Sequence, residues 1–123
     1  ICDASGTLTF RKPVDGFPLP RFGAACPIWP LYQALARPMT PIRAVAEMPG
    51  REARRFLTYA IAQPAGPTGF DAPPVFEATM LILPPGPGPL PDAPVAEVGT
   101  SCRICPRAEC PARREPSILG GAV

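Results

Sequence analysis

The sequence contains no histidine, a single lysine and no long apolar run. Without histidine, neither a Ser-His-Asp nor a Cys-His catalytic arrangement can form, and no imidazole can ligate a metal. The longest apolar stretches, such as residues 80–83, fall far short of the roughly 20 residues that span a bilayer. No basic segment followed by an apolar one marks a signal peptide at the N-terminus. We therefore expect a chain that is neither an enzyme nor a membrane or secreted protein.

Proline and glycine, with 21 and 11 copies, make up about a quarter of the 123 residues, and the formal net charge is only +2. A disordered chain combines few bulky apolar residues with a strong charge imbalance, and neither condition is met. The length suits one domain. We predict a single folded domain over residues 1–123, and the absence of an initiator methionine indicates a fragment of a longer polypeptide. Residues 84–94 contain six prolines and two glycines, which predicts an extended, exposed loop.

Proline and glycine also divide the chain into short elements. Pro30 fits the first turn of a helix over residues 31–37, where its missing N–H needs no partner, and Pro38 ends that helix. Apolar patterns predict strands over residues 7–11, 42–48, 55–61, 75–83 and 95–98. The turn at Pro49 and Gly50 makes the second and third of these a hairpin. The predicted fold class is α+β: a small, mostly antiparallel sheet with one or two short helices and a cysteine-rich zinc-binding tail.

The cysteines carry the strongest chemical signal. Their odd number, five, and the lack of a signal peptide favour a reducing cytoplasm over a disulfide-bonded secreted domain. Cys102, Cys105 and Cys110 follow a C-x2-C-x4-C spacing, which directs soft thiolates at one metal ion. Tetrahedral zinc needs a fourth ligand, and we favour Cys26, in a turn of small residues, over Cys2, which we expect at a frayed chain end. Residues 98–116 are thus predicted to bind one structural Zn²⁺.

Other interpretations of the thiols stay open. They fit buried, inert side chains or a disulfide, since free cysteine is often buried. An iron–sulfur cluster is the second form of the metal hypothesis. A site closed by four cysteines has no open coordination position, so it would be structural and not catalytic.

Four arginines accompany the cysteines: Arg103, Arg107, Arg113 and Arg114. A guanidinium fork matches phosphate geometry, so this cluster is a candidate clamp for a nucleotide or coenzyme A phosphate. The alternative is a solvated face that balances the thiolates, because Zn²⁺ with four of them carries a net charge of −2. The sequence favours neither.

Two segments together resemble a known family. Residues 15–32 read DGFPLPRFGAACPIWPLY and residues 98–116 read VGTSCRICPRAECPARREP. They are similar to the C-terminal domain of the short-chain fatty acyl-CoA regulators, bacterial transcription regulators with an XRE-type helix-turn-helix and a central segment similar to zinc metallopeptidases. The family's motif falls on Arg21, Phe22, Gly23, Cys26, Pro27 and Trp29, then on Cys102, Cys105, Arg107, Cys110 and Arg113.

The resemblance implies an effector-sensing regulatory domain, with a short-chain acyl-CoA as the ligand and homo-oligomerisation through the full-length regulator. This chain departs from a full member because it has no His-Glu-x-x-His and no helix-turn-helix pattern. We therefore expect no peptidase activity, no nucleic acid contact and no membrane contact from it. The alternative functions are a zinc-stabilised dimerisation module that binds no metabolite, and a redox sensor in which Cys102 and Cys105 release metal on oxidation.

Overall fold

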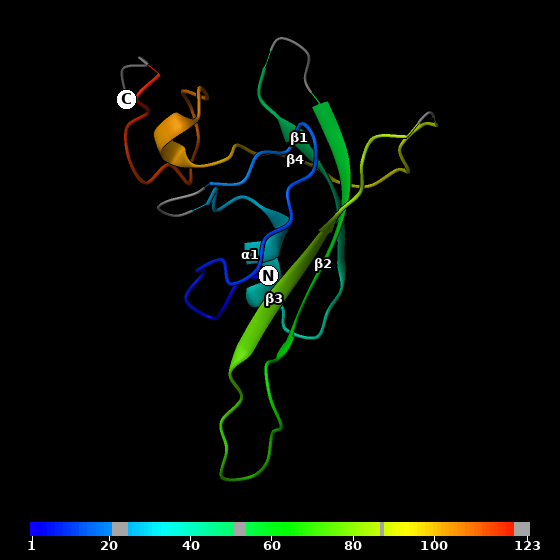
Figure 1. Cartoon of the computed structure of the whole chain (residues 1–123), viewed down its shortest axis with the longest axis vertical. Helices are drawn as coiled ribbons and strands as arrows, with labels where there is room; N and C mark the ends of the chain where they lie inside the picture. Colours follow the sequence, from blue (N-terminus) through cyan, green and yellow to red (C-terminus); the bar gives the residue numbers. More distant parts are fainter. Residues whose placement is uncertain (21–24, 51–53, 87, 120–123) are drawn as a thin grey trace.

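A computed structural model describes residues 1–20, 25–50, 54–86 and 88–119. Its elements are α1 (Pro30–Leu35), β1 (Ile42–Met48), β2 (Arg54–Pro64), β3 (Phe76–Ile82), β4 (Val95–Glu97) and a 3₁₀ turn, η1 (Cys102–Ile104). The four strands form one sheet in the order β3-β2-β1-β4 (Figure 1). β2 pairs antiparallel with both β1 and β3, whereas β4 is parallel to β1. The predicted α+β class and the β1–β2 hairpin are confirmed.

Helix α1 begins where the sequence predicted and ends two residues earlier. Pro30 occupies its first turn, and Leu31 and Ala34 are buried against the sheet. The N–H groups of Ala36 and Arg37 reach back only three residues, so the helix ends in a tight turn before Pro38. The helix packs against β1, β2 and β3 and covers one face of the sheet. No helix in the described ranges is long and apolar enough to cross a membrane.

The core lies between the sheet and α1. β2 alternates strictly, and its side chains at Phe56, Thr58, Ala60 and Ala62 are buried. Phe17 comes from an irregular loop and packs edge-on against Phe56, with ring centroids 5.3 Å apart. It also contacts Trp29, at 5.4 Å. The loop before α1 therefore supplies core side chains although it has no regular structure, which the alternation of strands alone does not predict.

The predicted strand over residues 7–11 is wrong. Thr9 and Phe10 both donate their backbone N–H to the carbonyl of Ile1, so two residues face one and a regular ladder cannot continue. Leu8 forms only an isolated bridge with Cys2, and Cys2 forms another with Ala78 of β3. The N-terminal segment is thus a short, irregular addition to the β3 edge.

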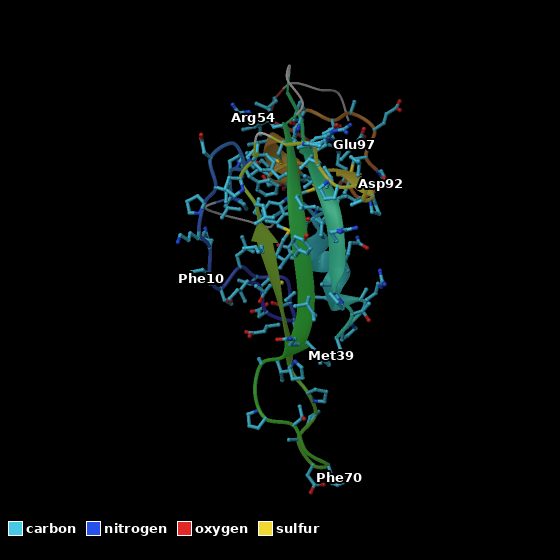
Figure 2. The ribbon with its side chains drawn as sticks, turned by 90° about the vertical axis from the view of Figure 1, so that its right-hand side faces the viewer. Phe10, Met39, Arg54, Phe70, Asp92 and Glu97 are labelled. Atoms are coloured by element: carbon cyan, nitrogen blue, oxygen red, sulfur yellow. The ribbon has the colours of Figure 1, made fainter. Side chains whose placement is uncertain are left out.

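The predicted loop over residues 84–94 connects β3 and β4, which lie at opposite edges of the sheet. Its described residues form neither helix nor strand, as expected, with residue 87 outside the description. The loop between β2 and β3 projects beyond the end of the sheet and carries Phe70 near its tip (Figure 2).

Candidate metal centre and its arginine braces

The cysteine-rich tail begins as a continuation of the sheet. The N–H of Val98 donates to the carbonyl of Glu47 on β1 over 3.0 Å, one residue past the end of β4. The 3₁₀ turn η1 follows, and the N–H of Cys105 bonds back to the carbonyl of Cys102 over 3.3 Å. Cys102 and Cys105, at the two ends of this tight turn, line the same small cavity.

Cys26 joins this tail from a distant part of the chain. Its N–H donates to the carbonyl of Thr100 over 2.9 Å. The N–H of Gly99 donates to the Cys26 sulfur over 3.4 Å, across 73 residues of sequence. The predicted approach of the Cys26 turn to the tail is therefore observed, although Gly23 of that turn lies outside the described residues.

All four predicted ligands line one small cavity of about 10 Å³, which is the space of roughly one water molecule or ion. Cys26, Cys102 and Cys105 are buried, whereas Cys110 is half-buried. All five cysteines are free thiols. Among the described residues, no three cysteines or carboxylates are gathered closely enough to form a metal-binding group. The donors thus have the right chemistry and a shared cavity, and zinc binding stays a prediction.

Burial raises the pKa of the Cys26 thiol above its usual value, against the opposing effect of the N–H groups of Gly99 and Ile28. The nearby thiols of Cys102 and Cys105 raise that pKa further. Without an added positive charge, Cys26 is a neutral thiol at pH 7 and a poor nucleophile. Cys26 is therefore not an activated nucleophile.

Cys2 does not lie at a frayed end, which corrects the expectation from its position in the sequence. Its side chain is completely buried in the core. Its N–H and carbonyl both pair with Ala78, at 2.9 and 3.0 Å. Cys2 does not line the cavity of the other four thiols. Two hydrogen bonds and a buried side chain hold it as an ordinary core residue.

Arg107 ties the tail to the sheet. Its guanidinium donates to the carbonyl of Val98 over 3.2 Å and to that of Glu47 over 2.9 Å. It also faces the carboxylate of the exposed Glu97 at 3.6 Å. Two of these three partners are backbone carbonyls, so this side chain fastens β1 to the start of the cysteine segment.

Arg113 braces the cysteine turn itself. It donates to the carbonyl of Cys102 over 3.0 Å and to that of Cys105 over 3.1 Å, and also to those of Glu115 and Arg107. Arg114 reaches the carbonyl of Ala25, next to Cys26. In contrast, Arg103 is exposed, and its guanidinium has no partner among the described residues. The geometry thus gives three of the four arginines a bracing role and leaves Arg103 accessible; a phosphate clamp stays a prediction.

Sequence reasoning missed Gly99, which lies at the centre of this arrangement. Its carbonyl accepts the indole N–H of buried Trp29 over 2.7 Å, while its own N–H contacts the Cys26 sulfur. The only local signal was a glycine three residues before the first cysteine of the tail. Of the motif residues named above, Arg21 and Phe22 also lie outside the described residues.

A helix-covered four-stranded sheet, with a thiol cluster held by arginines, defines a small α+β module. The family model described as "Short-chain fatty acyl coenzyme A regulator, C-terminal" matches residues 1–83. The chain belongs to this family.

Similar proteins extend the match over the cysteine tail. The chain is 31% identical to the propionyl-CoA carboxylase regulator of Cereibacter sphaeroides over 94% of its length and 26% of that protein. It is 32% identical to the HTH-type transcriptional regulator PrpR of Mycobacterium tuberculosis, over 98% of the chain and 26% of PrpR. A solved structure of a Mycobacterium tuberculosis transcriptional regulator matches with a TM-score of 0.74 at 29% identity, over 99% of this chain and 39% of that one. The chain therefore spans about a quarter of the length of these curated relatives.

Proposed function

We propose that this chain is the effector-sensing regulatory domain of a bacterial, cytoplasmic transcription regulator of short-chain acyl-CoA metabolism, and that a four-cysteine metal centre stabilises it. The names of the relatives support the regulatory part. The observation that carries the metal part is one cavity lined by thiols from Cys26 and from the distant tail. The whole regulator would assemble as a homo-oligomer.

The proposed centre holds one Zn²⁺ on Cys26, Cys102, Cys105 and Cys110. The four thiols line one cavity without being gathered into a metal-binding group among the described residues, so they would have to draw together around the ion. Metal binding of this kind contributes on the order of 10 kcal/mol in small domains. Loss of one tail ligand should therefore unfold or aggregate the domain.

Metal analysis of the purified chain tests this centre. We expect about one equivalent of zinc for the wild type and for Cys2→Ala, and loss of metal for Cys105→Ser. If the analysis finds iron and acid-labile sulfide and no zinc, the same four ligands hold an iron–sulfur cluster. Less than about half an equivalent of any metal, or equal metal loss from Cys2→Ala, contradicts the assignment.

The proposed effector is a short-chain acyl-CoA, whose phosphates would contact the tail arginines. Arg103 is exposed and its guanidinium has no hydrogen-bond partner among the described residues, whereas Arg113 already donates to backbone carbonyls. Lysine keeps the charge and loses the planar fork. Arg103→Lys should therefore weaken ligand binding without changing the metal content, and Arg113→Lys should loosen the metal segment.

Calorimetric titration with propionyl-CoA, run on the wild type and both variants, separates these effects. If Arg103→Lys binds like the wild type, Arg103 has no role in phosphate recognition. If the wild-type chain binds no ligand at about millimolar concentration, where affinity corresponds to only about 4 kcal/mol, this chain does not sense acyl-CoA by itself.

A second candidate function is a dimerisation module, because the sheet face opposite α1 exposes large apolar side chains among its polar ones. Tyr59 and Leu81 are cross-strand neighbours there, with 42% and 57% of their surfaces exposed. Sedimentation of the wild type and of Leu81→Glu tests it. A wild-type dimer that the charged variant converts to a monomer favours the module, and a wild-type monomer excludes it for this chain.

A further inference from the structure

A cavity lies beside the edge strand β3, apart from the one that Cys26 and the cysteine tail line. Its volume is about 410 Å³. Met80 and Ile82 of β3 line one side, and Leu8, Phe10 and Pro13 of the N-terminal segment line the other. Phe10 lies on the β3 side of the molecule (Figure 2). The cavity is a mostly apolar gap between a sheet edge and a neighbouring stretch of chain.

The β3 edge presents backbone groups to this cavity. Ala78 exchanges two hydrogen bonds with Cys2 and so directs its N–H and carbonyl away from β2. Leu83 donates its N–H to Leu57 of β2, in the opposite direction. The backbone N–H and carbonyl groups of successive strand residues point alternately to one neighbouring strand and to the other. The N–H and carbonyl of Met80 and Ile82 therefore also point away from β2. Among the described residues these four groups have no hydrogen-bond partner.

The N-terminal residues already pair with part of this edge and point into the gap. Cys2 is antiparallel to Ala78 on one side and to Leu8 on the other. Ile1 donates its terminal N–H to Phe10 over 2.9 Å, and it lines the cavity. A polypeptide that continues upstream in the same direction would place the residue immediately before Ile1 opposite Met80. The third residue before Ile1 would lie opposite Ile82.

We propose that this cavity is a slot for an extended polypeptide strand, filled by the residues that precede Ile1 in the parent regulator. The inference uses the part of the proposed function that makes this chain a domain of a longer protein, and is independent of the metal and the effector. The family model describes a C-terminal portion, so family members carry polypeptide before it. Three upstream residues would complete the β3 edge.

The size of the cavity agrees with this occupant. Strand residues rise about 3.3 Å, strands lie about 4.8 Å apart and packed layers about 10 Å apart, which assigns roughly 160 Å³ to each residue. The observed 410 Å³ therefore holds between two and three strand residues. This is the length needed to reach from Ile1 to Ile82.

The proposal also fixes the chemistry of the missing residues. The Cys2 side chain faces the core, so the first and third residues before Ile1 share its face. That face meets Trp29 and Leu31, which line the cavity. Both upstream positions should be apolar, and neither should be proline, because each must donate an N–H to β3.

Amide hydrogen exchange tests the proposal on two chains: the 123-residue chain and the same chain lengthened by the six residues that precede it naturally. The amides of Met80 and Ile82 should exchange about tenfold more slowly in the lengthened chain. The amides of Thr79 and Leu81 point toward β2 and serve as internal controls. Their exchange should change much less.

A variant cycle separates strand pairing from general stabilisation. Ile82→Pro removes the outward N–H on an edge strand, where proline is tolerated. The loss of stability that Ile82→Pro causes in the short chain measures the effect of removing the isoleucine side chain. Any additional loss in the lengthened chain measures the pairing of β3 with the upstream strand. The expected result is a larger fall in melting temperature in the lengthened chain.

Three results would overturn the proposal. One is unchanged exchange of Met80 and Ile82 on lengthening the chain, and another is an equal effect of Ile82→Pro in both chains. The third is protection of the same amides by propionyl-CoA in the short chain and equally in the lengthened chain. The last result would make the cavity the effector site. None of these readouts depends on metal content, so a failure here is distinct from a failure of the proposed centre.

Discussion

Gly99→Ala tests whether the glycine at the start of the tail holds the thiol cluster together. A Cβ on Gly99 would lie 2.9 Å from the Cys105 sulfur and 3.3 Å from the Cys105 Cβ. Carbon and sulfur that are not bonded do not approach so closely, and Cys105 is buried. Either the tail or the strand end must move. Such overpacking costs about 1–3 kcal/mol.

Thermal unfolding measures this cost, with the metal chelated and with the metal bound. At about 4 °C per kcal/mol for a domain of this size, the melting temperature should fall by roughly 4–12 °C. The metal-bound chain should lose more than the chelated one, because displacement of Cys105 also weakens its ligand set. The two melts thus separate a packing effect from a metal effect.

Gly66→Ala is the matched control. A Cβ at Gly66 meets nothing within 4 Å. Its substitution should leave stability unchanged or raise it slightly, by about 0.4–1 kcal/mol, through reduced freedom of the unfolded chain. Equal melting temperatures for the Gly99→Ala and Gly66→Ala variants would refute the close approach of Gly99 to the cysteine turn.

Three further predictions follow from the core. Trp29→Phe should cost about 1–3 kcal/mol in denaturant unfolding, because the buried carbonyl of Gly99 loses its indole donor; a smaller change contradicts that role. Cys2→Ser should also cost about 1–3 kcal/mol, more than Cys2→Ala, because it buries a hydroxyl among apolar neighbours; an equal cost for both argues for a polar site. Burial raises the pKa of Tyr32 to about 12 from the ordinary value near 10. The stability this provides should be complete below pH 10 and lost as the pH rises to 12, and Tyr32→Phe should abolish that portion of the loss in unfolding titrations.

The chain's regular elements were predictable because their signals are local. β1 has the predicted bounds, 42–48, and pairs with β2 as the predicted hairpin. α1 begins at Pro30, whose missing N–H suits a first turn. The predicted and observed strand ends differ by few residues. The largest difference is in β2, predicted over 55–61, which continues to Pro64 because its last residues pair with β3. Alternation and proline positions act within a few residues, so they can be read without the fold.

The candidate site divides in the same way. The C-x2-C-x4-C spacing and the accompanying arginines are visible in the sequence. The partners of those arginines are not, because Arg107 reaches across 60 residues to Glu47 and Arg114 across 89 residues to Ala25. The sequence alone therefore gave no preference between a phosphate-binding clamp and a solvated face of arginines. Only the packed structure distinguishes bracing side chains from the accessible Arg103.

The sequence by itself determined the element types, the absence of histidine chemistry and the grouping of three thiols, since each depends on neighbouring residues. Tertiary structure decided that Cys2 is buried, that residues 7–11 are not a strand and that Cys26 lies against Gly99. Each of these depends on which distant backbone groups remain unpaired once the sheet has formed. A buried N–H or carbonyl must find a partner, and that partner is chosen by proximity in space.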